Sequence, residues 1–370
     1  MKCFQWLTSL KLTLFCLIGL MLLVFLGTLE QISTGLLAAQ KKYFHSIFLY
    51  WGPVPYFPGG LFFSTLLILN LAASFVSRFK FRWKSLGIWL IHLGLVVLIV
   101  GEIMSAWLTV ESQMVIREGQ VANYSFDTHQ LELVIINSTD PEHDQVVAIG
   151  QQSLYPNNRI THSSLPFSLH IVQCYPNSRF EKLGEDIEPV ATRGWGTKVS
   201  VIPHQPTLKD DERNLLSVFV TLADKEQNAL GTWLLSNAIS ASQTLEFGGR
   251  QYELLVRNKR YYFPFSLELV EFIHELHPNT NIPKEFASKV NVFGADGDLE
   301  REARIYMNHP LRYQGKTFYQ ASFGENNTTS VLQVVDNPSR LTPYISSGLV
   351  CLGLAVQFSM SFFSFRRRKK

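Results

Sequence analysis

The apolar residues of this chain are gathered in four long uncharged runs. Three lie in the first third of the sequence, at Leu12–Leu29, Pro58–Val76 and Ser85–Gly101, inside expected helices at about residues 10–29, 58–76 and 85–107, and the fourth is Leu341–Phe365. Each run approaches or exceeds the roughly 18 residues that an α-helix needs to cross a bilayer. The pattern predicts three transmembrane helices within residues 1–108 and a fourth within residues 341–370.

The segment between the third and fourth runs, residues 109–340, has a different pattern. Short alternating or β-branched stretches recur there, separated by turn residues such as Ala295-Asp296-Gly297, and no stretch has a long 3.6-residue apolar period. The expected strands are Leu131–Ile136, Ser168–Val172, Lys198–Ile202, Ser217–Leu222, Tyr252–Val256, Ser266–Val270, Lys289–Phe293 and Val331–Val335. The predicted fold class is therefore a membrane α-helical protein with four transmembrane helices and a large β-rich domain between helices 3 and 4.

One stretch of the β-rich segment has a counterpart about a hundred residues later. The sequence Leu165-Pro-Phe-Ser-Leu-His-Ile171 resembles Phe263-Pro-Phe-Ser-Leu-Glu-Leu269. A proline at the start of a strand is sterically acceptable, so both stretches fit strands. The likeness indicates either two related β modules or a coincidence.

Charge gives the helices a direction. Eleven Lys and Arg residues lie in three stretches without acids, near the N-terminus, in the 78–84 loop and at residues 366–370. Residues 109–340 carry 20 basic and 28 acidic residues, a net charge of −8. Short basic loops stay in the cytoplasm, so both termini and the 78–84 loop are predicted to be cytoplasmic. Residues 30–57 and the β-rich domain are then extracytoplasmic, and the basic stretches give no reason to expect nucleic-acid binding.

The extracytoplasmic ends of the helices carry few chemical signals. Glu30 and Glu102 lie there and are expected to be solvated, and the prolines and glycines of residues 51–60 predict a short turn before the second helix. Cys174 is the only cysteine of the β-rich domain, so no structural disulfide is available within it. The absence of a Cys-x-x-Cys motif argues against a thiol–disulfide enzyme.

His92 is the candidate functional residue, because an ionisable group within a transmembrane helix is costly to bury. It lies in the third helix, closer to the cytoplasmic side. Gly87, Gly94 and Gly101 recur every seven residues and predict a smooth face for helix packing. His92 lies on the opposite face, among branched apolar side chains. An imidazole in this setting would either bind haem iron or donate a hydrogen bond to a carbonyl group of another helix.

The other nine histidines are all predicted to be extracytoplasmic. None of them has the spacing of a zinc site with cysteines or with a glutamate motif, so they are interpreted as surface or local hydrogen-bonding residues. The chain also lacks a nucleophile elbow, a P-loop and a dinucleotide-binding fingerprint. No catalytic residue is predicted, and the chain does not look like a self-sufficient enzyme.

Several motifs, spread almost from end to end, resemble the ResB-like cytochrome c biogenesis proteins, the smaller membrane component of System II. They are Ser9–Thr13, Phe25–Gln31, Ala39–Phe44, Phe57–Gly60, Trp83–Lys84, Gly87–Gly94, Glu111–Met114, Met307–Tyr313 and Thr317–Phe323. Any one of these motifs alone would be weak, whereas together with the four-helix layout they are specific.

The resemblance implies a role in the covalent attachment of haem to apocytochrome c outside the cytoplasm of a bacterium. ResB-like proteins work in the cytoplasmic (inner) membrane with a ResC- or CcsA-type haem-handling protein. This chain would therefore be a non-autonomous subunit of a holocytochrome c synthase complex. The resemblance also implies that His92 is a transmembrane axial ligand of haem b. The aromatic residues Tyr261–Phe263 and Phe318–Tyr319 would either contact a partner or pack in a core.

Two other classes of function are compatible with parts of the pattern. A structural scaffold would stabilise its membrane partner without contacting haem. A membrane sensor would bind a ligand in the β-rich domain, but the predicted cytoplasmic segments are too short for an output domain.

Overall fold

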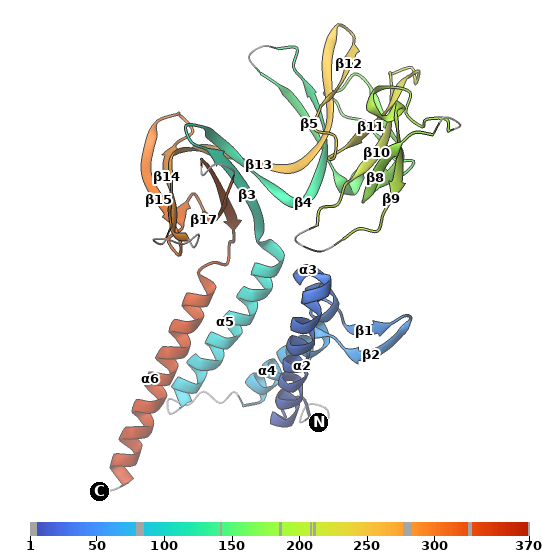
Figure 1. Cartoon of the computed structure of the whole chain (residues 1–370). Coiled ribbons are helices and arrows are strands. Elements are labelled where there is room, and N and C mark those ends of the chain that lie inside the picture. The colour runs from blue at the N-terminus through green and yellow to red at the C-terminus, as the bar shows by residue number, and fades with distance from the viewer. Residues whose placement is uncertain are drawn as a thin grey trace. The chain divides into compact units, whose positions relative to one another are not determined.

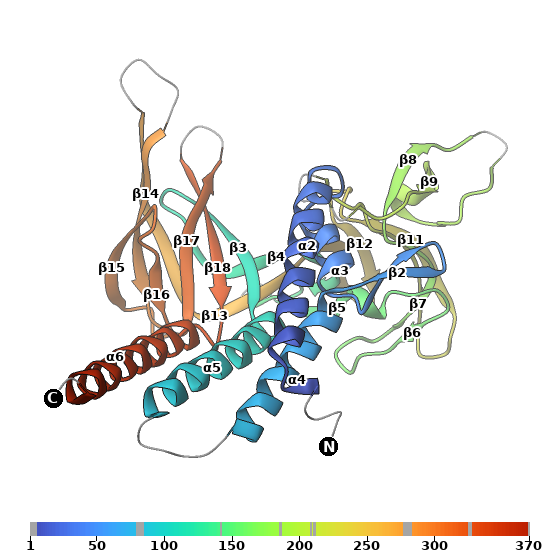
Figure 2. The same cartoon turned by 90° about the horizontal axis from the view of Figure 1, so that it is seen from below.

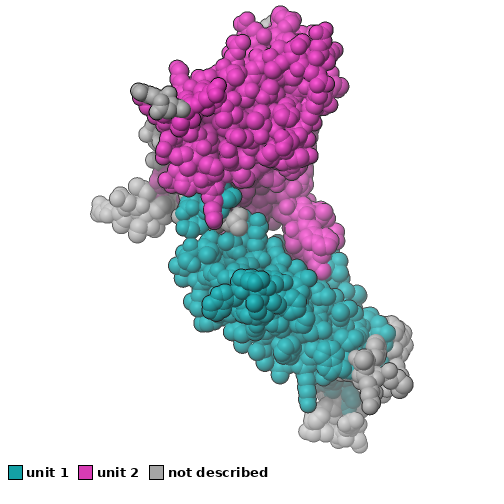
Figure 3. Space-filling model, turned by 90° about the vertical axis from the view of Figure 1, so that its right-hand side faces the viewer, with its two compact units in different colours: residues 1–100, 206–214, 342–370 teal, residues 101–205, 215–341 magenta. Residues whose placement is uncertain are grey.

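The computed structural model describes residues 6–78, 85–140, 143–184, 187–207, 209, 212–276, 283–324 and 328–368. The contacts divide the chain into two compact units, one of residues 1–100, 206–214 and 342–370, the other of residues 101–205 and 215–341 (Figure 3). Most of the basic 78–84 loop, the end of the basic tail, Cys3, Trp83 and His277 lie outside the described residues.

In the part of the chain that the structure describes, four helices are long and apolar enough to cross a membrane, and a β-rich domain follows the third of them (Figure 1). This confirms the predicted fold class. The four are α2 (Leu10–Thr34), α4 (Gly60–Arg78), α5 (Leu86–Leu108) and α6 (Thr342–Arg368).

Two further elements stand between α2 and α4. The short helix α3 (Leu36–Tyr43) follows Gly35, whose φ of +87° turns the chain at the end of α2. The strands β1 (Phe48–Trp51) and β2 (Val54–Pro58) form a hairpin where the sequence predicts only a turn.

The buried amide of Asn70 joins α4 to the start of α2. Its Oδ1 accepts a hydrogen bond from the Thr13 hydroxyl at 2.7 Å, and its Nδ2 donates to the carbonyl oxygens of Leu7 and Ser9. The hydrogen bonds on both ends of the amide satisfy its polar groups where water is scarce and tie the segment just before α2 to α4. The hydropathy pattern does not mark Asn70, because the residue lies in an otherwise apolar run.

The helices α5 and α6 pack closely along small residues and lie side by side in two views (Figures 1 and 2). A Cβ atom on Gly87 would fall 2.6 Å from the backbone nitrogen of Gln357, and one on Gly94 would fall 3.0 Å from the carbonyl oxygen of Ser346. The Ser346 hydroxyl donates a hydrogen bond to the Gly94 carbonyl at 2.9 Å. The glycine face predicted for the third helix therefore faces α6 at both positions.

This contact leads to a prediction about two glycines of α6. Replacing Gly353 with alanine is expected to lower the free energy of unfolding by about 1–3 kcal/mol through overpacking. The reason is that the new Cβ would lie 2.7 Å from the carbonyl oxygen of Gly87. Gly348→Ala is the matched control on the same helix, because a Cβ there meets no atom of the described residues within 4 Å. Thermal unfolding in detergent measures both, and equal midpoints for the two variants would contradict close α5–α6 packing.

The β-rich domain contains a large antiparallel sheet, a smaller four-stranded sheet and a two-stranded pair. The ten-stranded sheet has the order β15-β14-β13-β4-β3-β18-β17-β16, with β12 on β13 and β5 on β4. The four-stranded sheet has the order β11-β10-β7-β6, and β8 pairs with β9.

The strands have the following bounds: β3 Val110–Arg117, β4 Val121–Asn137, β5 Gln145–Gly150, β6 Arg159–Ile160, β7 Ser168–Tyr175, β8 Ser178–Lys182, β9 Val199–Pro203, β10 Ser217–Ala223, β11 Ala229–Ser236, β12 Gln243–Phe247, β13 Arg250–Leu276, β14 Pro283–Phe293, β15 Leu299–Tyr306, β16 Leu311–Tyr313, β17 Lys316–Phe323 and β18 Thr329–Asp336. Each of the eight predicted strands overlaps one of these.

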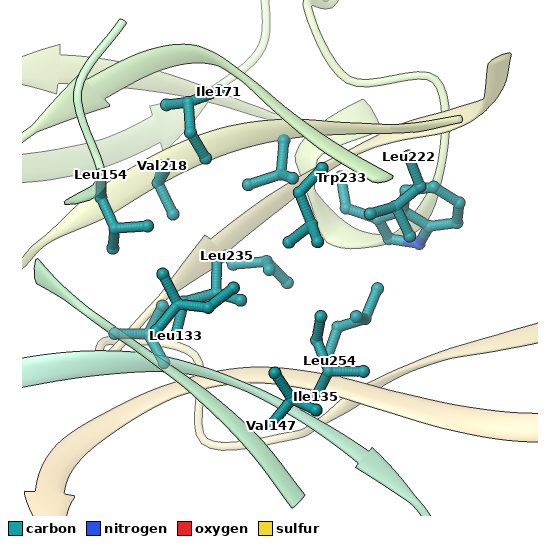
Figure 4. Close-up of a cluster of buried hydrophobic side chains, with 14 of the residues drawn as sticks. Leu133, Ile135, Val147, Leu154, Ile171, Val218, Leu222, Trp233, Leu235 and Leu254 are labelled. Atoms are coloured by element: carbon teal, nitrogen blue, oxygen red, sulfur yellow. The ribbon is translucent and has the colours of Figure 1, made fainter. Parts of the chain in front are cut away.

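Among the described residues, the domain has two large hydrophobic cores and a small third cluster of Ala191, Phe219 and Leu234. In the first, the four-stranded sheet faces β4, β5, β12 and β13, so that Ile171 and Val218 lie opposite Leu133 and Leu254 (Figure 4). The second core is enclosed by β3 and β13–β18 and includes Phe318.

The two similar stretches of sequence supply corresponding residues to different cores. Phe167, Leu169 and Ile171 are buried in the first core, and their counterparts Phe265, Leu267 and Leu269 are buried in the second. This arrangement is consistent with two related β modules. That the two modules arose by duplication stays a prediction.

The long strands β4 and β13 run through both cores, and polar side chains lie between the cores. Arg257 pairs with Glu132 at 2.9 Å, and both side chains are largely buried. Asp127 accepts a hydrogen bond from the Tyr261 hydroxyl at 3.0 Å, and its carbonyl oxygen accepts one from Asn258. Burial and the bond to Asp127 raise the pKa of Tyr261 to about 12, so its hydroxyl stays a donor. These five residues form the polar junction.

Candidate functional site

His92 lies on α5, nearer to the Leu86 end of that helix. Six residues separate it from Leu86 and sixteen from Leu108, which at 1.5 Å per residue is about 9 Å and about 24 Å along the axis. Its side chain is half-buried. The residue therefore lies well inside the helix that would cross the hydrocarbon layer, on the side that joins the 78–84 loop.

A hydrogen bond within the helix selects the tautomer of the neutral His92 ring. Its Nδ1 lies 2.7 Å from the carbonyl oxygen of Ile88, one turn earlier. A carbonyl oxygen only accepts, so Nδ1 carries the proton, and in the neutral ring Nε2 then has a free lone pair. Metal-binding histidines show this arrangement, in which the second nitrogen donates to a backbone carbonyl or carboxylate. The bond goes to the same helix, whereas one interpretation of the sequence expects a carbonyl of another helix.

The His92 face of α5 is not the face that packs on α6. His92 and Gly94 are two positions apart in the sequence, which places them about 160° apart around the helix. Trp89 lies one turn before His92 on its face and makes an edge contact with Phe75 of α4, with ring centroids 4.9 Å apart. Val96 lies one turn after His92. The imidazole thus has aromatic and branched apolar neighbours along one side of the helix.

Glu30, at the end of α2, is paired, although the sequence analysis expects it to be solvated. Lys42 Nζ lies 2.6 Å from its carboxylate, and the Tyr43 hydroxyl donates to it at 2.6 Å. Burial and this bond raise the pKa of Tyr43 above its usual value. The three groups fasten α3 to the end of α2, which is a structural role.

Two of the described outer histidines make clear local contacts. His309 stacks on Tyr306 with ring centroids 4.2 Å apart, and the His162 Nδ1 accepts a hydrogen bond from the Ser164 N–H. Within the described residues, no group of three or more His, Cys, Asp or Glu side chains is arranged to hold a metal ion. The interpretation of these histidines as local residues is consistent with such contacts.

Cys174 is a free thiol on β7, packed against the first core. Burial raises its pKa to about 11. The thiolate is the reactive form of cysteine, so this thiol is almost entirely protonated near neutral pH and is a poor nucleophile. A redox role for Cys174 gains no support from these surroundings.

The β-rich domain has an open cavity of about 560 Å³ that the sequence analysis does not predict. Arg193, Trp195, Trp233, Gln243 and Glu246 are among its lining residues. The Trp195 N–H donates to Gln243 Oε1 at 3.1 Å, next to Gly194, whose φ is +67°. In the sequence, the local sign of this cavity is Gly194-Trp-Gly196, because a glycine on each side of the exposed tryptophan allows backbone angles that other residues rarely adopt.

The two aromatic stretches singled out in the sequence have alternating side chains. Phe263 and Phe318 are buried in the second core, whereas 57% of Tyr262 and 40% of Tyr319 are exposed. Alternation along a strand produces this division. Core packing therefore accounts for Phe263 and Phe318, while Tyr262 and Tyr319 remain on the surface and Tyr261 is partly buried at the polar junction.

Four helices able to span a bilayer, with a β-rich domain between the third and the fourth, define a multi-pass membrane protein. The sequence model of the ResB-like family matches residues 240–335, which cover β12–β17 and nearly all of β18 and include both C-terminal motifs noted above. The resemblance to the ResB-like family is thereby confirmed.

Two curated relatives are similar to this chain. Protein NrfI of Wolinella succinogenes is 24% identical over 291 residues, which cover 78% of this chain and 29% of that protein. Cytochrome c biogenesis protein CcsB of Prochlorococcus marinus is 35% identical over 72 residues, 20% of this chain and 16% of that protein. The chain thus spans less than a third of the length of either relative.

Proposed function

We propose that this protein is a subunit of a cytochrome c assembly complex of the System II type in a bacterial cytoplasmic membrane. The support is the ResB-like match at residues 240–335 together with the two relatives, one of them named for cytochrome c biogenesis. The partner is a ResC- or CcsA-type haem-handling membrane protein, and the client is apocytochrome c. Haem b is the cargo, which is attached to the client outside the cytoplasm.

One observation carries the proposed contact with haem. His92 donates through Nδ1 to its own helix, so Nε2 is the nitrogen available for iron, on the face of α5 that is turned away from α6. Branched side chains one turn to either side, Ile88 and Val96, suit the apolar faces of a porphyrin. His92 would supply one axial ligand, and a histidine of the partner would supply the other.

The orientation of the chain follows from its charge. With both termini and the 78–84 loop in the cytoplasm, His92 lies nearer the cytoplasmic side, where haem is made available to the complex. The β-rich domain then lies outside, beside the site where the cysteines of the client react with the vinyl groups of haem. That domain would bind the partner or the client and shield the site.

Reconstitution of cytochrome c formation tests the proposed function. The chain, a ResC- or CcsA-type partner and a reporter apocytochrome c are co-expressed in a bacterial strain without its own maturation system. Covalently bound haem is then detected by its peroxidase activity on a denaturing gel. We expect a haem-stained reporter with all three proteins and only background staining when this chain is omitted. Equal staining with and without the chain, at equal levels of partner and reporter, would refute the proposal.

A further inference from the structure

The hairpin of β1 and β2 has a well-defined register. Leu49 is opposite Phe57, Trp51 is opposite Val54, and Gly52-Pro53 forms a two-residue loop in which Gly52 has a φ of +60°. A shift in register after Leu49 leaves Tyr56 as an extra residue on β2. The extra residue is a β-bulge, a feature that bends a strand and redirects a side chain.

One side of the hairpin packs on the helices. Leu49 is 1% exposed and belongs to a buried cluster with Leu23 of α2 and Phe63 of α4. The Phe57 and Phe63 rings have centroids 6.0 Å apart. The hairpin is therefore held firmly against the helices at its base.

The rest of the hairpin exposes large apolar and aromatic side chains. The exposed fractions are 57% for Tyr50, 84% for Trp51, 60% for Val54 and 52% for Tyr56. No charged residue occurs anywhere from Ser46 to Ser77. Hairpins that face water usually carry charges along their edges, and exposed apolar patches of this kind mark an interaction surface.

The place of the hairpin in the fold indicates what covers this surface. Strand β2 ends at Pro58, and the candidate span of α4 begins at Gly60, so the hairpin lies at the membrane end of that helix. In both views it extends sideways from α2, across the direction of that helix (Figures 1 and 2). An element across the axis of a spanning helix, at its end, runs along the membrane surface. Tryptophan and tyrosine prefer that depth, where the ring is apolar and its polar atom meets the headgroups.

We propose that the β1–β2 hairpin lies in the headgroup layer of the bilayer and anchors the α2–α4 pair there, with lipid covering Tyr50, Trp51 and Tyr56. The surface is thus a membrane-interface anchor formed by two strands. It fixes the depth and rotation of the two helices to which Leu49 and Phe57 attach it. The inference is independent of haem and of the proposed function.

Depth measurement with a spin label tests this anchor. The full chain, with its four native cysteines replaced by alanine, carries Trp51→Cys and is reconstituted in vesicles of phosphatidylethanolamine and phosphatidylglycerol. Asp296→Cys, in an exposed turn of the β-rich domain, is the control. We expect the label at position 51 to collide more often with oxygen and less often with a water-soluble nickel chelate than the label at position 296.

Two results would overturn the proposal. Equal access of the nickel chelate to both labels would place the hairpin in water. Protection of position 51 from both oxygen and the chelate would mean that protein, and not lipid, covers it.

A second measurement uses the native tryptophan and needs no cysteine variants. Lipids brominated near the headgroup are expected to quench part of the tryptophan emission of the native chain, and this part should be missing in Trp51→Phe. The substitution keeps an aromatic ring at an exposed position, so it leaves folding intact. Identical quenching of the two proteins would also overturn the proposal.

Discussion

Replacing His92 with glycine is expected to remove haem from the purified complex of this chain and its partner while the complex stays assembled. The glycine variant loses the whole imidazole, including the Nε2 atom that is proposed to meet iron. Removal of residues that merely orient a metal ligand lowers affinity by roughly 10–100-fold, and loss of the ligand itself is expected to do at least as much. Haem content and the absorption spectrum of the complex measure the effect, and staining of the reporter cytochrome should fall to background.

Two companion variants and a rescue experiment separate ligand loss from damage to the helix. Glycine within a helix costs about 1 kcal/mol, whereas His92→Ala removes the imidazole without that penalty and should lose haem equally. Leu93→Ala truncates the exposed neighbouring residue and should keep haem. Added imidazole should restore the spectrum of the glycine variant, because it can occupy the space that the side chain left.

The scaffold hypothesis gives the opposite expectation. If both His92 variants hold as much haem as the native complex, with an unchanged spectrum, His92 is not a ligand. The protein would then support its partner without touching haem. If a His92 variant also loses the partner, this face of α5 has a packing role. The Leu93→Ala control shows whether such a loss comes instead from general instability of the helix.

Much of the membrane part of the fold is predictable, because hydropathy and helical periodicity are local properties. The spacing of Gly87 and Gly94 predicts a packing face, and α6 occupies it. The partners of individual polar groups are not local. Asn70 pairs with residues about sixty positions earlier, and Glu30 with Lys42, which comes after a turn at Gly35. Sequence patterns mark such residues as costly in a membrane but do not say which group satisfies them.

The β-rich domain shows the same division between local and non-local information. Alternation locates the strands, because it depends only on which face of each strand is buried. It does not show that β13 continues from Arg250 to Leu276 through both cores, since the predicted strands Tyr252–Val256 and Ser266–Val270 look separate. The orientation of His92 is partly local and partly non-local information. Periodicity predicts its face, whereas its bond to the Ile88 carbonyl depends on a side-chain rotamer.

The largest stability effect is expected at the polar junction, from Arg257→Met. Glu132 has a side chain that is 7% exposed, and the Arg257 guanidinium, 13% exposed, lies 2.9 Å from it. Removing one partner of a buried pair leaves a desolvated charge, which typically costs about 3–5 kcal/mol. Denaturant unfolding of the full chain in detergent, followed by near-ultraviolet circular dichroism, should show this loss.

The chain contains a matched control on the same long strand. Glu271 of β13 pairs across strands with Lys289 at 2.5 Å, but these side chains are 51% and 50% exposed. Exposed pairs contribute about 0–1 kcal/mol, so Lys289→Met should hardly change the unfolding midpoint. If Lys289→Met and Arg257→Met destabilise the protein equally, burial does not determine how much the Arg257–Glu132 pair contributes to stability.

The double variant Glu132→Met/Arg257→Met distinguishes a costly unpaired charge from a pair that is itself strongly stabilising. Apolar side chains of similar volume often replace a buried ion pair without loss, because the cost of removing two charges from water offsets their attraction. We therefore expect the double variant to recover most of the stability that Arg257→Met loses. If it stays as unstable as the single variant, the ion pair itself holds β4 and β13 together where the two cores meet. The junction would then owe its stability to charge, and not only to the packing of the cores on either side.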